Sequence, residues 1–295
     1  MTVGFVGLGI MGGHMARNLA ASRPLVVYDV DESRAEAVTS SPGSMEGTRA
    51  AGSLAELGGE CDLVLLSLPT SEVVQAVITG DGGLAGSLAP GALVVDTSTT
   101  EPTVTIALEQ ELRERGIGFI DSPVSGGEGG AKAATLSIMM GGSEELCERA
   151  RPVLEVIGGS VVRVGDAGAG EVAKLVNNMI VASTFSVIAE SFALGKKMGL
   201  DVKELYEAIR GGWAGSAVLD VAGPGIIERN FTPGGSVDVL FKDMGYALSL
   251  ARRNNVPTPM TAAADEIFKT ARASGRGPEA QQAIIKLWED LLGLS

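Results

Sequence analysis

The chain has 295 residues, a length that exceeds one typical domain and favours two. Its formal net charge of −13 disfavours nucleic acid and anionic membrane surfaces as partners, while 45% hydrophobic residues suffice for a sizeable core. Cys61 and Cys147 stand far apart without metal-ligand spacing, so we expect neither a disulfide framework nor a metal site.

Short apolar runs alternate with helical stretches through the first half of the chain. The expected strands are Val3–Val6, Leu25–Tyr28, Leu63–Ser67, Leu93–Asp96, Gly118–Asp121, Leu136–Met140 and Ser160–Val164. Their apolar runs lack polar alternation, which suits strands that are covered on both faces and hence a largely parallel sheet. We therefore expect a Rossmann-like, mostly parallel α/β domain over residues 1–164.

The pattern changes after Gly165, where helical periodicity takes over. The expected helices are Glu171–Met198, Val202–Arg210, Lys242–Arg253, Thr258–Ala273 and Glu279–Leu292. The glycine- and proline-rich stretch 223–235 is expected to be irregular. The second domain, over residues 165–295, is thus predicted to be all-helical, with its first long helix joining the two halves.

Neither a membrane span nor a targeting segment is expected. The apolar stretch 176–195 contains Asn177, Asn178 and Glu190, which favours a buried helix over a membrane-spanning one. The N-terminus is rich in glycine and lacks a basic leading segment, so it does not resemble a signal peptide. We expect a cytoplasmic protein.

The first predicted strand leads directly into the glycine-rich turn Gly7-Leu8-Gly9-Ile10-Met11-Gly12, and a helical pattern follows at once. In this context Gly7 permits a tight turn, Gly9 lets the backbone approach a pyrophosphate, and Gly12 lets helix and strand pack closely. Asp29 ends the next strand, near the spacing of about 20 residues expected for a ribose-binding acid. The alternative is a turn that serves packing alone. The combination predicts a dinucleotide site for NAD, with NADP as the alternative.

The only histidine of the chain is His14, which lies in the helix after the glycine turn. This inventory excludes a histidine-dependent dehydrogenase, a Ser-His-Asp hydrolase and a histidine-rich metal site. A hydride-transfer enzyme built from this chain must move its proton with a lysine, a tyrosine or a carboxylate.

Two further segments supply candidate site residues. Lys174 and Asn178 are four residues apart, so they share one face of an otherwise apolar helix. A surface lysine with a buried stem is the alternative, and the asparagine one turn on favours a catalytic pair. The turn Ser125-Gly126-Gly127 follows a predicted strand, where its amides and hydroxyl could bind a carboxylate. An ordinary flexible loop is the alternative there.

Four segments, in this order and spacing, resemble the β-hydroxyacid dehydrogenase family over essentially the whole chain. They are GFVGLGIMG, DSPVSGG, GDAGAGEVAKLVNN and Lys242-Asp243-Met244. The family includes 3-hydroxyisobutyrate dehydrogenase, tartronate semialdehyde reductase and, more distantly, 6-phosphogluconate dehydrogenase. Ala134-Thr135 and Gly234-Gly235 depart from the usual pattern, which concerns the shape of the substrate pocket and not the chemistry.

The resemblance implies a role for each matching residue. Lys174 would exchange the proton with the carbonyl oxygen, and Asn178 would orient the substrate. The Ser125-Gly126-Gly127 turn would bind the substrate carboxylate, and Lys242 would lie near cofactor and substrate. The nicotinamide side would be lined by Leu68, Pro69 and Thr99.

The predicted function is an NAD-dependent oxidoreductase, acting on a CH–OH group, that interconverts a short 3-hydroxy acid and its semialdehyde. The resemblance favours tartronate semialdehyde and glycerate, with 3-hydroxyisobutyrate, glyoxylate or succinic semialdehyde as alternatives. A homodimer or homotetramer is expected on the same ground. An imine reductase is disfavoured because Lys174 is present. The alternative from another class, a non-catalytic nucleotide sensor, would have no use for the lysine, the asparagine and the serine-glycine turn together.

Overall fold

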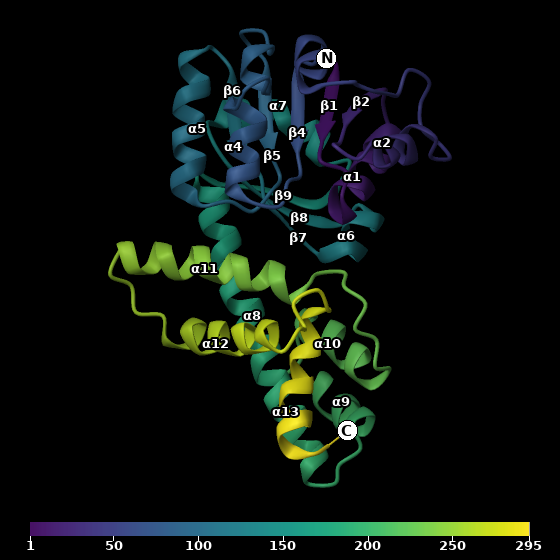
Figure 1. Cartoon of the computed structure of the whole chain (residues 1–295), viewed down its shortest axis with the longest axis vertical. Coiled ribbons are helices and arrows are strands. Elements are labelled where there is room, and N and C mark those ends of the chain that lie inside the picture. Colours follow the sequence, from purple (N-terminus) through teal and green to yellow (C-terminus); the bar gives the residue numbers. More distant parts are fainter. Residues whose placement is uncertain (295) are drawn as a thin grey trace. The chain divides into compact units, whose positions relative to one another are not determined.

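The computed structural model describes residues 1–294 of the chain (Figure 1). These residues form two compact units, an N-terminal unit over Met1–Lys174 and a helical unit from Leu175 onward. The long helix that the sequence predicts between the two halves is α8 (Ala169–Lys197), and the division between the units falls inside it.

The N-terminal unit is built on one sheet of nine strands, in the order β3-β2-β1-β4-β5-β6-β8-β7, with β9 paired to β8. From β3 to β6 all neighbouring strands are parallel, whereas β8 runs antiparallel to β6 and β7. The strands are β1 (Val3–Val6), β2 (Leu25–Tyr28), β3 (Arg49–Ala50), β4 (Leu63–Leu66), β5 (Leu93–Asp96), β6 (Gly118–Asp121), β7 (Val124–Ser125), β8 (Leu136–Gly141) and β9 (Gly158–Gly165). The predicted Rossmann-like, mostly parallel sheet is confirmed.

Helices cover both faces of this sheet because successive residues of its buried strands point to opposite sides. On β5, Leu93 and Val95 pack into the core under α1, α2 and α7, whereas Val94 packs into the core under α3, α4 and α5. Figure 1 shows α4 and α5 together on one side of the strands. The helical segments are α1 (Ile10–Ala20), α2 (Glu32–Thr39), α3 (Leu54–Glu60), α4 (Ser71–Thr79), the 3₁₀ turn η1 (Leu84–Gly86), α5 (Pro102–Glu114), α6 (Gly127–Ala133) and α7 (Glu144–Leu154).

The helical unit packs around the aromatic residues Phe185, Phe192 and Phe268. Besides most of α8 it contains α9 (Val202–Arg210), α10 (Ala217–Ile227), α11 (Val237–Arg253), α12 (Pro259–Ala273), the 3₁₀ turn η2 (Gln281–Ile284) and α13 (Ile285–Leu292). Helix α8 is long and apolar enough to cross a membrane by length and composition alone. Its side chains Phe185 and Phe192 are buried in this core, whereas Ile180 and Leu194 are exposed, so the predicted buried helix is buried along one side only.

The prediction of an irregular segment over 223–235 is wrong in its first part, because α10 continues to Ile227. Gly223 is required there, since a β-carbon would lie 2.4 Å from the ring of Tyr206. The glycine that suggests a loop in the sequence therefore serves the close packing of α10 on α9, and Pro224 is accommodated inside the helix.

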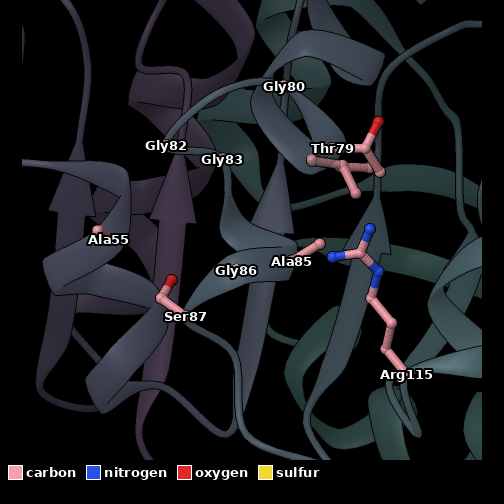
Figure 2. Close-up of a pocket in the computed structure, with 10 residues that line it drawn as sticks. Ala55, Thr79, Gly80, Gly82, Gly83, Ala85, Gly86, Ser87 and Arg115 are labelled. Carbon is pink, nitrogen blue, oxygen red and sulfur yellow. The ribbon is translucent and has the colours of Figure 1, made fainter.

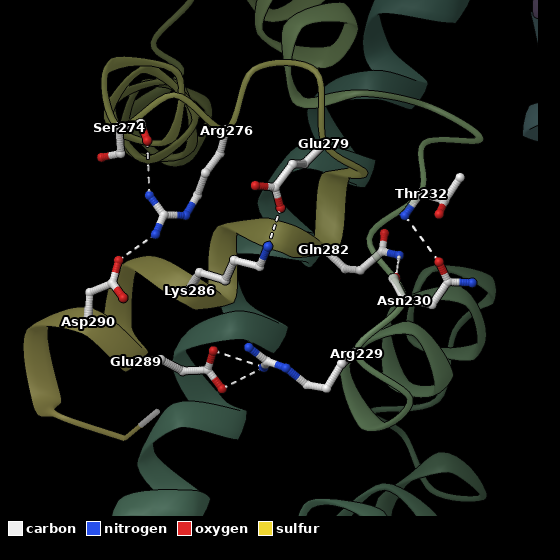
Figure 3. A network of polar contacts seen from close by, with 10 residues as sticks. All are labelled: Arg229, Asn230, Thr232, Ser274, Arg276, Glu279, Gln282, Lys286, Glu289 and Asp290. Carbon is white, nitrogen blue, oxygen red and sulfur yellow. Dashed lines mark hydrogen bonds and ion pairs between the residues drawn. The ribbon is translucent and has the colours of Figure 1, made fainter.

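Charged side chains connect α13 to the segments after α10 and α12 (Figure 3). Glu289 on α13 is 4% exposed, and its oxygens lie 2.8 and 2.9 Å from Arg229 Nη1. Lys196 Nζ of α8 lies 3.1 Å from Glu289 Oε1. Arg276 pairs with Asp290 and Lys286 pairs with Glu279 in the same region. The helical unit thus compensates its buried glutamate with two cations.

Candidate active site

The glycine turn between β1 and α1 has one position that packing does not explain. Gly7 has a φ of 90°, and a β-carbon there would lie 2.3 Å from the carbonyl oxygen of Ser67. At Gly12 a β-carbon would lie 1.9 Å from the carbonyl oxygen of Gly7. Packing alone therefore demands both glycines, whereas at Gly9 a β-carbon would meet only Arg34 Nη1, at 3.7 Å. The open side at Gly9 is what a cradle for a pyrophosphate requires.

The amides that open α1 are suited to an anion. Helices α2, α3, α4 and α7 begin with a Ser, Thr or Asp side chain that accepts from their first turn. At the start of α1 stands Gly9, which has no side chain to cap the helix. The first-turn amides of this helix of 11 residues, with its positive dipole end, therefore face the open side of the turn and fit the phosphates of a dinucleotide.

Asp29 stands at the end of β2 beside this turn. Its Oδ2 accepts from Leu8 N at 2.6 Å and its Oδ1 accepts from Asp31 N at 2.9 Å. Each carboxylate oxygen keeps a further lone pair, so the fixed acid can still accept from ribose hydroxyls. Arg34 lies nearby, with Nη1 3.9 Å from Asp29 Oδ2 and Nε 3.2 Å from Asp31 Oδ2. The residues present fit an NAD-type cofactor.

The loops after β4 and β5 are fastened to each other at the carboxyl edge of the sheet. Leu68 N donates to Ser98 Oγ at 2.9 Å, and Thr97 Oγ1 donates to Leu66 O at 2.6 Å. These bonds bring Leu68-Pro69 beside the loop that carries Thr99. The three predicted nicotinamide-side residues thus come from two adjacent loops, as expected for ligands of a parallel sheet.

The Ser125-Gly126-Gly127 turn has a backbone that glycine favours. Gly126 has a φ of 135° and Gly127 a φ of 60°, and both residues are exposed. Helix α6 begins at Gly127 and is tied to α1, because Asn18 Nδ2 donates to Ala131 O at 2.8 Å. His14 Nε2 lies 3.3 Å from Glu128 Oε1 in the same contact. The single histidine therefore joins the helix of the glycine turn to the helix of the serine-glycine turn.

The first turn of α8 is anchored by two carboxylates that the sequence prediction missed. Asp121, the last residue of β6, accepts from Gly168 N at 2.8 Å and from Glu171 N at 2.9 Å. Glu171 in turn accepts from Thr100 N at 3.0 Å and from Thr100 Oγ1 at 3.1 Å. The available signal was an acid at a strand end and another just before Lys174, but a sequence does not show which backbone amides such acids will meet.

These carboxylates are fully buried, and burial shifts their ionisation. Burial raises the pKa of Asp121 to about 6, against the opposing effect of the two amides that donate to it. Burial and the nearby charge of Asp96 hold the pKa of Glu171 well above its usual range. The end of β6 and the start of α8 therefore carry two acids whose pKa values lie above those of ordinary carboxylates.

Lys174 and Asn178 lie one turn apart on α8, as the sequence predicts. Lys174 is partly buried and is the last residue of the N-terminal unit. Asn178 is buried in the helical unit, where its Nδ2 donates to Asp243 Oδ2 at 2.6 Å. Lys242 Nζ lies 3.1 Å from Asp243 Oδ1, so Asp243 links the predicted residues Asn178 and Lys242.

The structure thus gathers the predicted site residues in two groups. Those of the N-terminal unit are Gly7, Leu8, Gly9, Ile10, Met11, Gly12, Asp29, Leu68, Pro69, Thr99, Ser125, Gly126, Gly127 and Lys174. Asn178 and Lys242 belong to the helical unit, and Asp243 is the residue there that sequence reasoning missed. The roles of all these residues stay predictions.

A hollow of about 230 Å³ in the N-terminal unit lies away from these residues (Figure 2). It is lined by the loop of Gly80, Gly82 and Gly83 and by Arg115, which precede the amino ends of β5 and β6. Ligands of parallel sheets bind at the opposite, carboxyl edge. Arg115 donates to Glu111 at 2.8 Å, so its guanidinium is already paired. The hollow does not contribute to the candidate site.

Comparison with known proteins places both halves of the chain in one class. Residues 2–165 match the family described as the NAD binding domain of 6-phosphogluconate dehydrogenase. Residues 168–288 match the family described as NAD-binding of NADP-dependent 3-hydroxyisobutyrate dehydrogenase. Together the fold, the glycine turn and these matches define an NAD(P)-dependent oxidoreductase.

Whole-chain relatives narrow this class. The chain is 37% identical over 295 residues to 2-(hydroxymethyl)glutarate dehydrogenase of Eubacterium barkeri, covering 99% of this chain and 96% of the relative. It is 34% identical to 2-hydroxy-3-oxopropionate reductase of Escherichia coli strain K12, covering 98% and 97%. A solved structure of Mycobacterium tuberculosis 3-hydroxyisobutyrate dehydrogenase with L-serine superposes with a TM-score of 0.86 at 32% identity, covering 97% and 98%. The chain belongs to the β-hydroxyacid dehydrogenase family, and the predicted resemblance is confirmed.

Proposed function

We propose that this dehydrogenase interconverts a short 3-hydroxy acid and its semialdehyde, with glycerate and 2-hydroxy-3-oxopropionate (tartronate semialdehyde) as the favoured pair. The compounds named for its relatives share a carboxylate, one intervening carbon, and a carbon that bears a hydroxyl or an aldehyde. They differ in the group on the intervening carbon. The shared part is the chemistry for which the candidate site is equipped.

The observation that carries this proposal is that Lys174, the Ser125-Gly126-Gly127 turn and the dinucleotide turn all belong to the N-terminal unit. When bound, the nicotinamide supplies or accepts the hydride. Lys174 delivers the accompanying proton to the carbonyl oxygen during reduction and removes it during oxidation. Hydride and proton together convert the aldehyde to the alcohol, so no further reductant is required.

The substrate acid group is bound by the serine-glycine turn in this proposal. Gly126, the residue before α6, makes no side-chain capping bond, and its φ of 135° turns the backbone sharply at this point. Charge-assisted bonds from such amides and from Ser125 Oγ contribute roughly 1.5–3 kcal/mol each. In the helical unit, Asp243 contacts both Asn178 and Lys242, the two residues there to which the family resemblance gives a role toward the substrate.

A panel of alcohols tests the proposal through the absorbance of the reduced nicotinamide. Glycerate, L-serine, 3-hydroxyisobutyrate and 2-(hydroxymethyl)glutarate are compared with a neutral diol of similar size. We expect glycerate to give the highest kcat/KM, and loss of the acid to cost at least about tenfold for each lost bond. Equal kcat/KM for glycerate and the neutral diol would refute the hydroxyacid proposal.

The second candidate substrate is 2-(hydroxymethyl)glutarate, because a relative of that name is 37% identical over 295 residues. This compound carries two carboxylates, and a formal net charge of −13 on the protein opposes the approach of a dianion more than that of a monoanion. The same panel decides between them, since a dicarboxylate site would turn over glycerate poorly.

NAD is the proposed cofactor, in preference to NADP. The carboxylate of Asp29 is fixed by two backbone amides beside the glycine turn, where a 2′-phosphate would meet like charge. Arg34 lies 3.2 Å from Asp31 and 3.9 Å from Asp29, so its guanidinium opposes this preference by favouring a 2′-phosphate. We expect a higher kcat/KM with NADH than with NADPH, and the reverse order would remove Asp29 as the determinant.

A further inference from the structure

Glu171 is a fully buried acid near the carboxyl edge of the sheet. It lies in the first turn of α8, three residues before Lys174, and is 0% exposed. Its two carboxylate oxygens each accept one hydrogen bond from Thr100, one from the backbone amide and one from the hydroxyl. Thr100 Oγ1 also lies 2.8 Å from Thr105 Oγ1, so the Thr105 hydroxyl can donate a hydrogen bond to the Thr100 hydroxyl.

These bonds are part of a series of hydrogen bonds that connects the loop after β4, the loop after β5 and the first turn of α8. Leu68 N donates to Ser98 Oγ at 2.9 Å, which ties the loop after β4 to the loop after β5. Two residues along the same loop, Thr100 meets Glu171 of α8. The loop that carries Thr99 is thus fastened at one side to Leu68 and at the other to the turn of helix that carries Lys174.

We propose that Glu171 is a positioning residue that fixes the first turn of α8, and with it Lys174, against the loop that carries Thr99. This inference rests on the proposed function, since it takes Lys174 as the proton donor and Thr99 as a nicotinamide neighbour. A catalytic group displaced by about 1 Å can lose two orders of magnitude in rate, so fastening this turn has a direct catalytic value.

The chemistry of the partners defines which side chains can do this. Both groups that donate a hydrogen bond to the Glu171 carboxylate belong to Thr100, and the Thr100 hydroxyl can act either as donor or as acceptor. A glutamine could therefore accept from the Thr100 amide with its carbonyl oxygen and donate to the hydroxyl, which would then donate to Thr105. A protonated glutamic acid makes the same set of bonds. Burial, which raises the pKa of Glu171, agrees with a role that needs the hydrogen bonds and not the charge.

The test compares Glu171→Ala with Glu171→Gln, and uses Glu289→Ala as a matched control in the helical unit. Glu289 is 4% exposed and has no part in the proposed mechanism. We expect Glu171→Ala to lower kcat by about 10- to 100-fold while the KM for NADH changes less than about threefold. Glu171→Gln should restore kcat to within about fivefold. Glu289→Ala should lower thermal stability but leave the kcat of the folded fraction unchanged.

A second measurement makes the inference independent of substrate identity. Hydrogen exchange of the backbone amides over 97–101 and 168–174 should become faster in Glu171→Ala and stay slow in Glu171→Gln. If no acid of the panel is turned over, the proposed function fails while this measurement still decides whether Glu171 fastens the turn. The inference is overturned if Glu171→Ala keeps wild-type kcat or wild-type exchange, or if Glu171→Gln is as impaired as the alanine variant.

Discussion

Among residues 1–294, which the structure describes, two glutamates are buried, one in each unit, and their carboxylates have opposite kinds of partner. Glu289 in the helical unit meets the cation Arg229 (Figure 3) and also the cation Lys196. Glu171 in the N-terminal unit meets the backbone amide and the hydroxyl of one threonine. One carboxylate is compensated in charge, and the other only in hydrogen bonds.

This difference indicates that Glu289 serves the stability of the helical unit, whereas Glu171 serves the candidate site. A buried carboxylate that meets two cations holds three segments of the helical unit together. A buried carboxylate bonded by neutral groups favours its protonated form, and such perturbed acids concentrate where chemistry is done. In this chain the second kind lies beside the start of α8, which carries Lys174, and the first kind lies on α13, far along the sequence from any predicted catalytic residue.

The largest expected effect belongs to Lys174. Lys174→Ala should lower kcat by roughly two to four orders of magnitude, the usual contribution of a positioned acid or base. Lys196→Ala is its matched control, because Lys196 stands on the same helix but pairs with Glu289. Steady-state kinetics should show normal turnover for Lys196→Ala and unchanged NADH affinity for both. Normal turnover of Lys174→Ala would remove this lysine from the mechanism.

The ion-paired side of the comparison is tested by Arg229→Ala. This change leaves Glu289 buried with Lys196 as a cation partner, and losing a hydrogen bond from a charged donor to a buried carboxylate costs about 1.5–3 kcal/mol. Urea unfolding should therefore show a clear loss of stability, whereas the kcat of the folded enzyme should stay within about twofold. A loss of kcat with unchanged stability would contradict the division between the two glutamates.

The pH dependence of stability sharpens the comparison from the N-terminal side. An unfolded aspartate releases its proton near ~3.9, whereas folded Asp121 does so at about 6. Between these values the folded state binds more protons, so the free energy of unfolding falls as pH rises. The pKa of Glu171 is raised well above its usual range, which extends the fall to higher pH.

Urea unfolding at pH 5, 6.5 and 8 measures this effect. Asp121 alone should lower the wild-type free energy of unfolding by about 1 kcal/mol between pH 5 and pH 8. Glu171→Gln removes a titrating group and should flatten the decline. A wild-type stability that rises over this interval would contradict the assignment of buried, protonated acids.

The fold could be predicted well because its signals are local. The apolar runs of β1, β2, β5 and β6 and the amphipathic period of α9 fix these elements at the residues that the sequence predicts. The strands β3 and β7 have two residues each, too few to show a pattern. Helix α10 could not be predicted because it contains Gly223 and Pro224, and the fit of Gly223 depends on Tyr206 of another helix.

The site was predicted less completely, for the same physical reason. Gly7, Gly9 and Gly12 could be predicted because they act together within one short turn, so their spacing along the chain identifies them. Asp121 and Asp243 could not, because each acts on groups far away in sequence, at Glu171 and at Asn178. Residues that hold other residues in place are identified only by contacts, and these appear only once the chain is folded.

The smallest expected effect is that of Ser125→Ala, which concerns the carboxylate of the substrate. In the proposed function the serine-glycine turn donates to this carboxylate with neutral groups, as Thr100 does to Glu171. Ser125→Ala removes one hydroxyl from the serine-glycine turn but leaves the backbone of Gly126 and Gly127 in place. One charge-assisted bond contributes roughly 1.5–3 kcal/mol, so kcat/KM for glycerate should fall at least about tenfold. The weak activity on a neutral diol should not change, since that substrate never used the bond. Ser143→Ala, which removes the cap of α7, serves as the control for a general loss of stability. If Ser125→Ala lowers acids and neutral alcohols equally, the turn acts through the backbone of the loop and not through the acid group.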